Sequence, residues 1–163
     1  MKHVPTQAEF ERLPYRRGVG IVLLNPAKQA FVAQRLDSPE PAWQFPQGGI
    51  DQDEDPLLAA RRELVEETGV TSAELIAETP DWLRYDLPRD LVPKVWKGRY
   101  RGQEQKWYAF RFLGPDSEIR IDGEHPEFSA WRWMNFLETP SLIVEFKRPL
   151  YEQVVKAFQH LVR

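Results

Sequence analysis

The sequence GGIDQDEDPLLAARRELVEETGV, residues 48–70, contains the clearest helix pattern in the chain. It begins with two glycines, and Asp55-Pro56 then supplies a capping carboxylate followed by proline at the first helical position. Gly69 stands just past the last helical residue, where glycine adopts the left-handed conformation of a C-terminal cap without strain. We therefore predict a helix over residues 55–69, preceded by a glycine-rich loop.

Acidic residues gather near the end of this predicted helix. Glu63, Glu66 and Glu67 are spaced i, i+3 and i+4, which predicts that they share one helical face. Taken alone, such acids are more often a solvated helix surface. Crowded carboxylates nevertheless repel one another unless cations neutralise them, and hard divalent ions that bridge to phosphate are the natural partners. The spacing alone leaves both interpretations open.

Strand patterns flank the helix on both sides. Residues 19–24 form a continuous aliphatic run that ends at a turn, and residues 30–36 follow as its predicted hairpin partner. Further strands are predicted at residues 74–78, 106–113 and 128–134, and a second helix at residues 150–162. Residues 1–14 form a polar lead, and no linker or repeat interrupts the rest. The pattern predicts one α/β or α+β domain over residues 1–163.

Composition excludes several functional classes. With 22 Lys and Arg against 25 Asp and Glu, the formal net charge of −3 excludes a generally basic nucleic-acid coat protein and a polybasic membrane binder. No apolar run has the length of a membrane span or a signal peptide, so we expect a cytoplasmic protein without a membrane partner. The absence of cysteine excludes disulfides, thiolate zinc sites and cysteine nucleophiles.

Residues 48–70 resemble the signature of the Nudix hydrolases: G, five residues, E, seven residues, R-E, an aliphatic residue, any residue, E-E, any residue, G, and an aliphatic residue. The matching positions are Gly48, Glu54, Arg62, Glu63, Leu64, Glu66, Glu67, Gly69 and Val70. The resemblance implies the Nudix fold, an α/β/α sandwich with a mixed β-sheet. It also implies Mg²⁺, Mn²⁺ or another divalent cation and hydrolysis of a nucleoside diphosphate linked to another group.

The resemblance also assigns roles to individual residues. It implies that Glu63, Glu66 and Glu67 are metal ligands, with Glu127 in Pro126-Glu127-Phe128 as a further ligand. Either Glu63 or Glu127 is expected to act as the catalytic base. Arg62 is similar to the arginine that orients these carboxylates, and Glu54 is its expected partner. Gly48 and Gly49 are expected to let substrate approach the backbone closely.

A wider resemblance covers most of the chain and identifies it as similar to bacterial RNA pyrophosphohydrolases and dinucleoside polyphosphate hydrolases. It rests on Tyr15-Arg16 and on the stretches 43–50, 82–88, 102–108, 126–128, 131–133 and 146–149. Arg17-Gly18 departs from the Pro-Asn that is usual in this branch. The substrate-binding residues that the resemblance implies are Arg16, Arg35, Lys106, Phe146 and Lys147.

Residues 94–111 suggest a site for a polyphosphate with an attached base. They hold six basic residues against one acid, interleaved with aromatic residues that can stack on bases. The ordinary alternative is that most of these aromatics are strand residues that face the core.

Three functional alternatives follow for the whole chain. The first is a Mg²⁺-dependent pyrophosphohydrolase acting on 5′-polyphosphate RNA, on dinucleoside polyphosphates such as diadenosine tetraphosphate, or on both, by metal-activated water attack on phosphorus. The second is a Nudix hydrolase of another nucleoside diphosphate-linked substrate. The third is a nucleotide-sensing binding module, which the intact acidic cluster argues against. DNA is not an expected partner, and the oligomeric state is not predicted.

Overall fold

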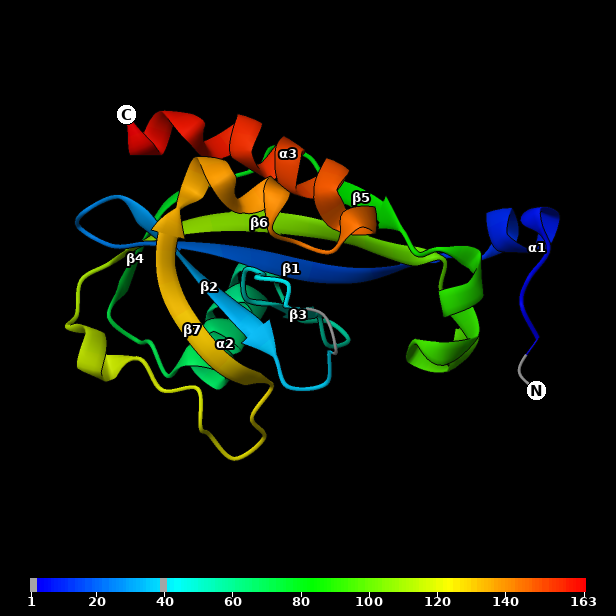
Figure 1. Ribbon diagram of the computed structural model, residues 1–163, viewed down its shortest axis with the longest axis horizontal. Helices are drawn as coiled ribbons and strands as arrows, with labels where there is room; N and C mark the ends of the chain where they lie inside the picture. Colours follow the sequence, from blue (N-terminus) through cyan, green and yellow to red (C-terminus); the bar gives the residue numbers. More distant parts are fainter. Residues whose placement is uncertain (1–2, 39–40) are drawn as a thin grey trace.

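A mixed β-sheet forms the centre of the molecule in the computed structural model, which describes residues 3–38 and 41–163 (Figure 1). Its core path is β4-β6-β1-β2-β7, with β3 added to β1 and β5 added to β6. Strands β1 and β6 run parallel, and the other strand pairs among the described residues are antiparallel. The strands in chain order are β1 Tyr15–Leu24, β2 Gln29–Arg35, β3 Gln47–Gly49, β4 Ala73–Glu78, β5 Leu83–Asp86, β6 Gly102–Phe112 and β7 Phe128–Asn135.

Two longer helices cover the sheet from opposite sides (Figure 1). Helix α2, Pro56–Thr68, lies on one face, and α3, Arg148–Phe158, lies along the other, which makes an α/β/α sandwich. A short helix α1, Gln7–Arg12, stands beyond one end of the sheet. The 3₁₀ turns are η1 Arg89–Lys94, η2 Trp96–Gly98, η3 Asp116–Glu118, η4 Phe136–Ser141, η5 Glu145–Lys147 and η6 Gln159–Val162.

The alternation of side chains along the strands divides the core into two layers. In β1, Ile21 and Leu23 pack in the layer under α2, whereas Val22 and Leu24 pack in the layer under α3. The strands β2 and β6 alternate in the same way. Because both faces are covered, β1 is a continuous apolar run rather than an alternating one.

The predicted strands are all present, although their ends differ. The strand predicted at residues 19–24 begins at Tyr15. The more polar residues before Val19 also pair with β6, as far as Tyr15↔Gly102. The strand predicted at residues 106–113 begins at Gly102 for the same reason. The sheet and its two covering helices confirm the predicted α/β class and mixed sheet.

The two ends of the chain differ from the predictions. The lead at residues 1–14 contains α1, where Thr6 and Glu9 form a reciprocal capping box and Phe10 is buried. The helix predicted at residues 150–162 begins earlier, at Arg148, and leaves the α conformation after Phe158 to finish as η6. Its apolar spacing continues across this change, which is why the sequence pattern did not mark it.

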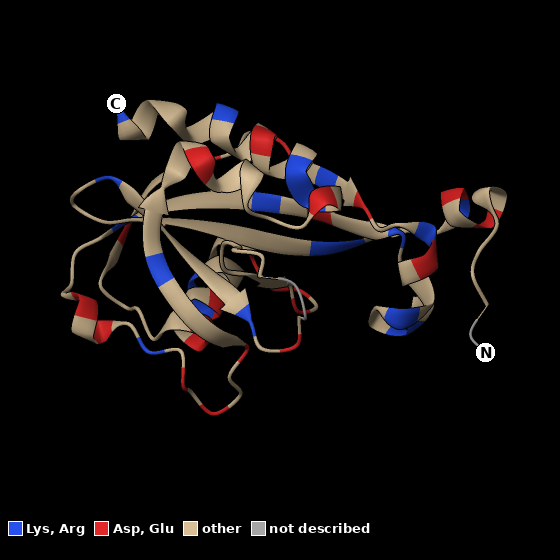
Figure 2. Ribbon diagram, viewed as in Figure 1, with Lys and Arg blue, Asp and Glu red and all other residues tan. Residues whose placement is uncertain are grey.

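Charge is mixed over the surface of the described residues. In Figure 2, basic and acidic segments alternate along α1, the 3₁₀ turns and α3. This distribution agrees with the small net charge and limits any anion site to a local feature. None of the helices in residues 3–38 and 41–163 is both long and apolar enough to cross a membrane.

Candidate active site

The glycine-rich loop and α2 form one unit. The side chain of Asp55 caps α2 by accepting from the backbone nitrogens of Leu57 and Leu58, at 3.0 and 3.3 Å. Gly69 ends the helix with φ +73°, the left-handed cap expected from the sequence. Strand β3 pairs with β1 so that Gly48 lies opposite Val19. The loop is thereby fixed against the centre of the sheet.

Gly48 allows the Glu63 carboxyl group to reach the loop backbone. A Cβ atom at Gly48 would lie only 2.0 Å from the carboxyl carbon of Glu63, closer than any real contact. A residue with a side chain at this position would therefore displace Glu63. Glycine is required here by close approach and not by a positive φ angle.

Arg62 holds the acidic residues of the loop and helix together. Its Nε and Nη2 donate to both carboxylate oxygens of Glu54, at 2.8 and 2.9 Å. Its Nη1 donates to Glu63 at 2.8 Å, and its Nη2 also donates to the carbonyl of Gly49 at 3.0 Å. The bidentate ion pair between Arg62 and Glu54 lowers the pKa of Glu54 to about 2 and raises the pKa of Arg62. The structure thus places Arg62 where it orients Glu63 relative to the loop.

Glu63 and Glu67 are buried carboxyl groups. Burial raises the pKa of Glu63 to about 7 against the opposing effect of Arg62, and it raises the pKa of Glu67 well above its usual range. The charges of Glu127 and Glu63 raise the pKa of Glu67 further. The Glu67 Oε2 atom is buried without a hydrogen-bond partner. These two side chains lie in an environment that favours a bound cation.

Glu66 and Glu127 are placed differently from the expected converging cluster. Glu66 is exposed and turns toward Arg62, with 3.3 Å between its Oε2 and Nη1. Glu127 is also exposed, within electrostatic reach of Glu63 and Glu67. In the described part of the chain, no three His, Cys, Asp or Glu side chains are arranged to hold a metal ion. The carboxylates repel one another, and Arg62 attracts Glu66, which together explain why the four carboxylates do not converge.

The donor set still fits a hard divalent cation. Carboxylate oxygens are the ligands that Mg²⁺ prefers, and the unpartnered Glu67 Oε2 is a buried acceptor that such an ion would satisfy. A positive ion would also favour the ionised form of the buried pair, which burial and repulsion disfavour.

A central cleft of about 480 Å³ lies beside these carboxylates. Arg35, at one side of it, makes a two-point ion pair with Asp37 at 2.8 and 2.7 Å and interacts electrostatically with Glu127 and Glu67. The cleft combines cations, amides and aromatic rings, a composition suited to a phosphate chain with an attached base. The side chains of these kinds that line it are Arg35, Lys94, Lys147, Gln44, Gln47, Tyr85, Trp96 and Phe146.

Phe146 and Lys147 enter the cleft from η5. The Phe146 ring lies 6.0 Å from the ring of Tyr85, and the Lys147 Nζ lies 5.3 Å from the same ring. Lys147 is buried, and burial together with the charge of Arg35 lowers its pKa to about 8. Here the structure brings together three of the predicted substrate-binding residues, Arg35, Phe146 and Lys147.

Arg16 lies between the loop and η2. A Cβ atom at Gly49 would lie 2.2 Å from its Nη2, so the missing side chain makes room for the guanidinium group. The same group lies 5.3 Å from the centre of the Trp96 ring. Trp96 and Lys97 both have positive φ angles, 47° and 59°, which non-glycine residues rarely adopt. The strained turn directs Trp96 toward Arg16 and the cleft.

Lys106 and much of residues 94–111 lie elsewhere. The Lys106 Nζ faces the carbonyl of Pro80 at 3.4 Å and Glu78 at 3.8 Å, outside the set of residues that line the central cleft. Trp107, Tyr108 and Phe110 are buried in the core, as the ordinary alternative for strand aromatics predicted.

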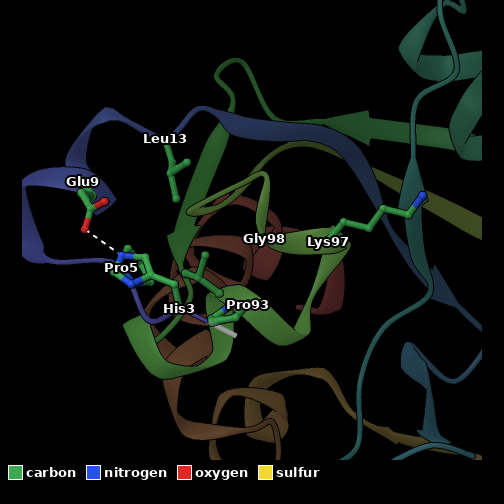
Figure 3. A pocket seen from close by; sticks show the side chains of 8 residues that line it. His3, Pro5, Glu9, Leu13, Pro93, Lys97 and Gly98 are labelled. Carbon is green, nitrogen blue, oxygen red and sulfur yellow. Dashed lines mark hydrogen bonds and ion pairs between the residues drawn. The ribbon is translucent and has the colours of Figure 1, made fainter. Parts of the chain in front are cut away.

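Lys97 belongs to a different hollow, the outer pocket, which holds about 580 Å³ between α1 and the 3₁₀ turns (Figure 3). Its other lining residues include His3, Glu9, Leu13 and Pro93. In Figure 3, the Lys97 side chain extends away from the hydrogen-bonded pair of His3 and Glu9.

Gln44, Gln47 and Tyr85 are among the lining residues of the cleft that were not predicted as site residues. All three fall in stretches that carried the wider resemblance, residues 43–50 and 82–88. Neutral amides and a tyrosine give no charge pattern in the sequence. The only signal that could have identified these three residues is that their stretches adjoin the glycines and the strands.

Comparisons with known proteins point to one family. The NUDIX domain model matches residues 14–154. The chain is 58% identical over 156 residues to the RNA pyrophosphohydrolase of Roseobacter denitrificans, covering 94% of this chain and 98% of that protein. It is 59% identical over 143 residues to the RNA pyrophosphohydrolase of Rhodospirillum rubrum, covering 88% and 86%.

Among solved structures, the fold is similar to a C. elegans Ap4A hydrolase complex, with a TM-score of 0.65, 20% identity and coverage of 89% of this chain and 98% of that one. It is also similar to the E. coli dihydroneopterin triphosphate pyrophosphohydrolase, with a TM-score of 0.65, 20% identity and coverage of 87% and 97%. At this identity the two likenesses concern the fold alone.

Proposed function

Because the chain belongs to the NUDIX domain family, we propose that it is a divalent-cation-dependent pyrophosphohydrolase of 5′-polyphosphate RNA, dinucleoside polyphosphates, or both. The names of the RNA pyrophosphohydrolase relatives, at more than half identity over most of the chain, support the RNA substrate. The cytoplasm is the proposed location, because RNA 5′ ends are formed there in bacteria such as the relatives.

One observation carries this proposal. Buried carboxyl groups on α2, Glu63 and Glu67, lie beside a cleft whose wall holds Arg35 and Lys147. The acidic side chains attract a cation, and the basic side chains beside them attract an anion. Together they suit a polyphosphate that is bound with a divalent ion.

Different residues of the chain have different roles in the proposed hydrolysis. Glu63, Glu66, Glu67 and Glu127 would hold Mg²⁺, Mn²⁺ or a similar ion, which when bound neutralises phosphoryl oxygens and lowers the pKa of water. Arg62 fixes the direction of Glu63 through two hydrogen-bonded partners, Glu54 and Gly49. Glu63 or Glu127 accepts the proton of the attacking water as phosphorus is attacked. Arg35 and Lys147 bind the phosphate chain.

A second substrate class is supported by Trp96. Its ring lines the cleft, as that of Phe146 does, which gives two aromatic side chains for two bases. A dinucleoside polyphosphate offers two bases, whereas a triphosphorylated RNA end offers one beside its 5′ phosphates. Lys106 remains a proposed phosphate contact, although its amine faces Pro80 and Glu78 in this structure.

A side-by-side assay tests the proposal. The full chain is incubated with Mg²⁺ and either 5′-triphosphorylated RNA, diadenosine tetraphosphate or a nucleotide sugar, and initial rates are compared with those in EDTA. We expect metal-dependent hydrolysis of at least one of the first two. Exclusive cleavage of the nucleotide sugar would favour the other Nudix substrates, and binding of all three without turnover would favour a sensing module.

A further inference from the structure

A cluster of three glutamines lies under the central cleft. Gln105 and Gln103, both on β6, are 0% and 1% exposed, and Gln47 on β3 lines the cleft above them. The Gln105 Nε2 donates to the Oε1 atoms of Gln47 and Gln103, each at 2.7 Å. One buried amide group therefore uses both of its hydrogens on two neighbouring amide oxygens.

These two hydrogen bonds fix the orientation of Gln47. In this arrangement, rotating the Gln105 amide alone by 180° would place three carbonyl oxygens against one another, which is strongly unfavourable. With its Oε1 held by the buried Gln105, the planar amide of Gln47 must direct its Nε2 away from the cluster. That nitrogen makes no hydrogen bond to any described residue. Two donor hydrogens are left for the cleft.

Gln47 stands where the cleft meets the acidic residues. Its backbone lies near enough to the Glu67 carboxyl group to lower the pKa of that group, and the next residue, Gly48, contacts Glu63. Its side chain shares the cleft with Arg35 and Lys147. A polyphosphate reaching from the aromatic part of the cleft to the carboxylates would pass this amide.

We propose that the Gln47 side-chain amide donates a hydrogen bond to a phosphoryl oxygen of the substrate, and that Gln105 is the positioning residue that fixes this donor. The proposal deepens the proposed function, on which it rests for the identity of the substrate. Phosphoryl oxygens are acceptors, and an amide nitrogen only donates. A neutral donor also suits this place, because a lysine or arginine here would be drawn to Glu67.

The unpartnered oxygen of Gln105 supports the positioning role. Its Oε1 is buried without a hydrogen-bond partner, which lowers stability. An apolar residue of similar size would fill the same space without that cost. What only the glutamine supplies is the pair of hydrogens that hold the two amide oxygens in place.

The first test is Gln47→Glu. The variant keeps an oxygen for Gln105 and replaces the donor nitrogen with a charged oxygen that repels phosphate. We expect KM to rise at least tenfold for each substrate that the parent cleaves, with kcat changed less than about threefold. The matched control is Gln159→Glu, which adds the same charge at an exposed position in η6 and should leave KM and kcat at the parent values.

A binding test separates phosphate recognition from base recognition. Binding of inorganic tripolyphosphate and of adenosine is followed by tryptophan fluorescence in buffer free of divalent cations. Gln47→Glu should weaken tripolyphosphate binding at least tenfold and leave adenosine binding unchanged. Weakened adenosine binding with unchanged tripolyphosphate binding would overturn the proposal in favour of base recognition, and so would unchanged binding of both.

The second test is Gln105→Met, which removes the two donated hydrogen bonds without touching the cleft. We expect a rise in KM of about threefold to tenfold with kcat and thermal unfolding temperature close to the parent, as a positioning role requires. A loss of unfolding temperature with unchanged KM would make Gln105 merely structural and overturn its assignment. If the parent hydrolyses neither RNA nor diadenosine tetraphosphate, the proposed function fails, and the tripolyphosphate experiment still decides the role of Gln47.

Discussion

At the scale of single residues, Glu67 connects stability with cation binding. It is a buried acid with one unpartnered oxygen and with Glu127 and Glu63 as like-charged neighbours. A group in that position destabilises the metal-free fold and becomes favourable when a cation binds it. The residue is therefore expected to report metal binding through unfolding as well as through catalysis.

Glu67→Gln tests this connection. We expect kcat to fall by about 10²-fold or more, because one hard oxygen ligand is lost. The metal-free variant should unfold at a higher temperature than the parent, and added Mg²⁺ should raise that temperature less than it does for the parent. The control is Glu152→Gln, an exposed acid on α3 that should show the parent response to Mg²⁺. A parental Mg²⁺ shift in Glu67→Gln would remove this residue from the ligand set.

Lys147 gives a stability effect with a defined pH dependence. Its pKa is lowered from 10.5 to about 8, so the unfolded chain binds the proton more tightly than the folded protein. Between about pH 8 and pH 10.5, the free energy of unfolding therefore rises with pH. Below about pH 8 the buried amine is charged, and the folded state bears the full free-energy cost of burying that charge. This cost comes to roughly 3 kcal/mol as an upper limit.

Lys147→Met should therefore stabilise the fold and weaken substrate binding. We expect a gain of up to about 3 kcal/mol at pH 7 and less than about 1 kcal/mol at pH 10, measured by urea unfolding of both proteins. KM should rise several-fold, because a phosphate contact is lost. An equal gain at both pH values would show that packing, and not charge, is responsible.

Local spacing predicted the acidic part of the site, and long-range contacts determine the rest. Arg62 and Glu66 are spaced i, i+4 on one helix, so helical periodicity alone brings them together. The position of Gln47 over Gln105 depends on two strands that are separated by more than 50 residues. No local pattern contains that information, and the same holds for Tyr85 against Phe146.

At the scale of elements, the 3₁₀ turns η1 and η2 separate two hollows. Leu91, Lys94 and Trp96 face the central cleft, whereas Val92, Pro93 and Lys97 line the outer pocket. The change of side between Trp96 and Lys97 coincides with their positive φ angles. This backbone turn decides which side chains of the basic and aromatic stretch can meet a substrate.

Trp96→Ala tests the role of that turn in substrate choice. We expect kcat/KM for diadenosine tetraphosphate to fall at least tenfold, because a stacking surface of about 1 to 3 kcal/mol is removed. Triphosphorylated RNA should lose much less, since it is affected only through the contact of Trp96 with Arg16. Lys97→Ala is the control and should retain parental rates, because this side chain lines the outer pocket. Equal losses on both substrates would contradict a selective role for Trp96.

Elements with a strong repeating pattern were predicted, and elements held by single contacts were not. The helix α2 carries both caps and a periodic face within 15 residues, so its ends were predicted closely. The helix α1 has six residues and a single buried aromatic, Phe10, which packs against Arg101, the residue before β6. The short strand β5 exists through its pairing with β6. Such elements depend on partners that a local window does not include.

In the molecule as a whole, the sheet separates two core layers, one packed against each of its faces. Leu23 and Leu24 are neighbours in β1, yet Leu23 packs under α2 and Leu24 packs under α3. Both side chains are almost fully buried, at 0% and 4% exposure. This pair offers a direct test of the prediction that residues 1–163 form one cooperative domain.

Leu23→Ala and Leu24→Ala should each lower the free energy of unfolding by about 3 kcal/mol, the usual cost of a core cavity. In both variants, tryptophan fluorescence and far-ultraviolet circular dichroism should report the same single transition. Two separated transitions in either variant would mean that the layers unfold independently, which would contradict a single domain.

The parallel pairing of β1 with β6 also determines when this protein can complete its fold during synthesis. Tyr15 to Leu24 leave the ribosome before their partners, Gly102 to Arg111, which emerge only after the glycine-rich loop and α2. Until then β1 has β2 and β3 beside it and an open edge on its other side. A nascent chain that pauses before residue 111 would expose that apolar edge to other chains, so translation speed over residues 50–110 is expected to influence the yield of folded protein.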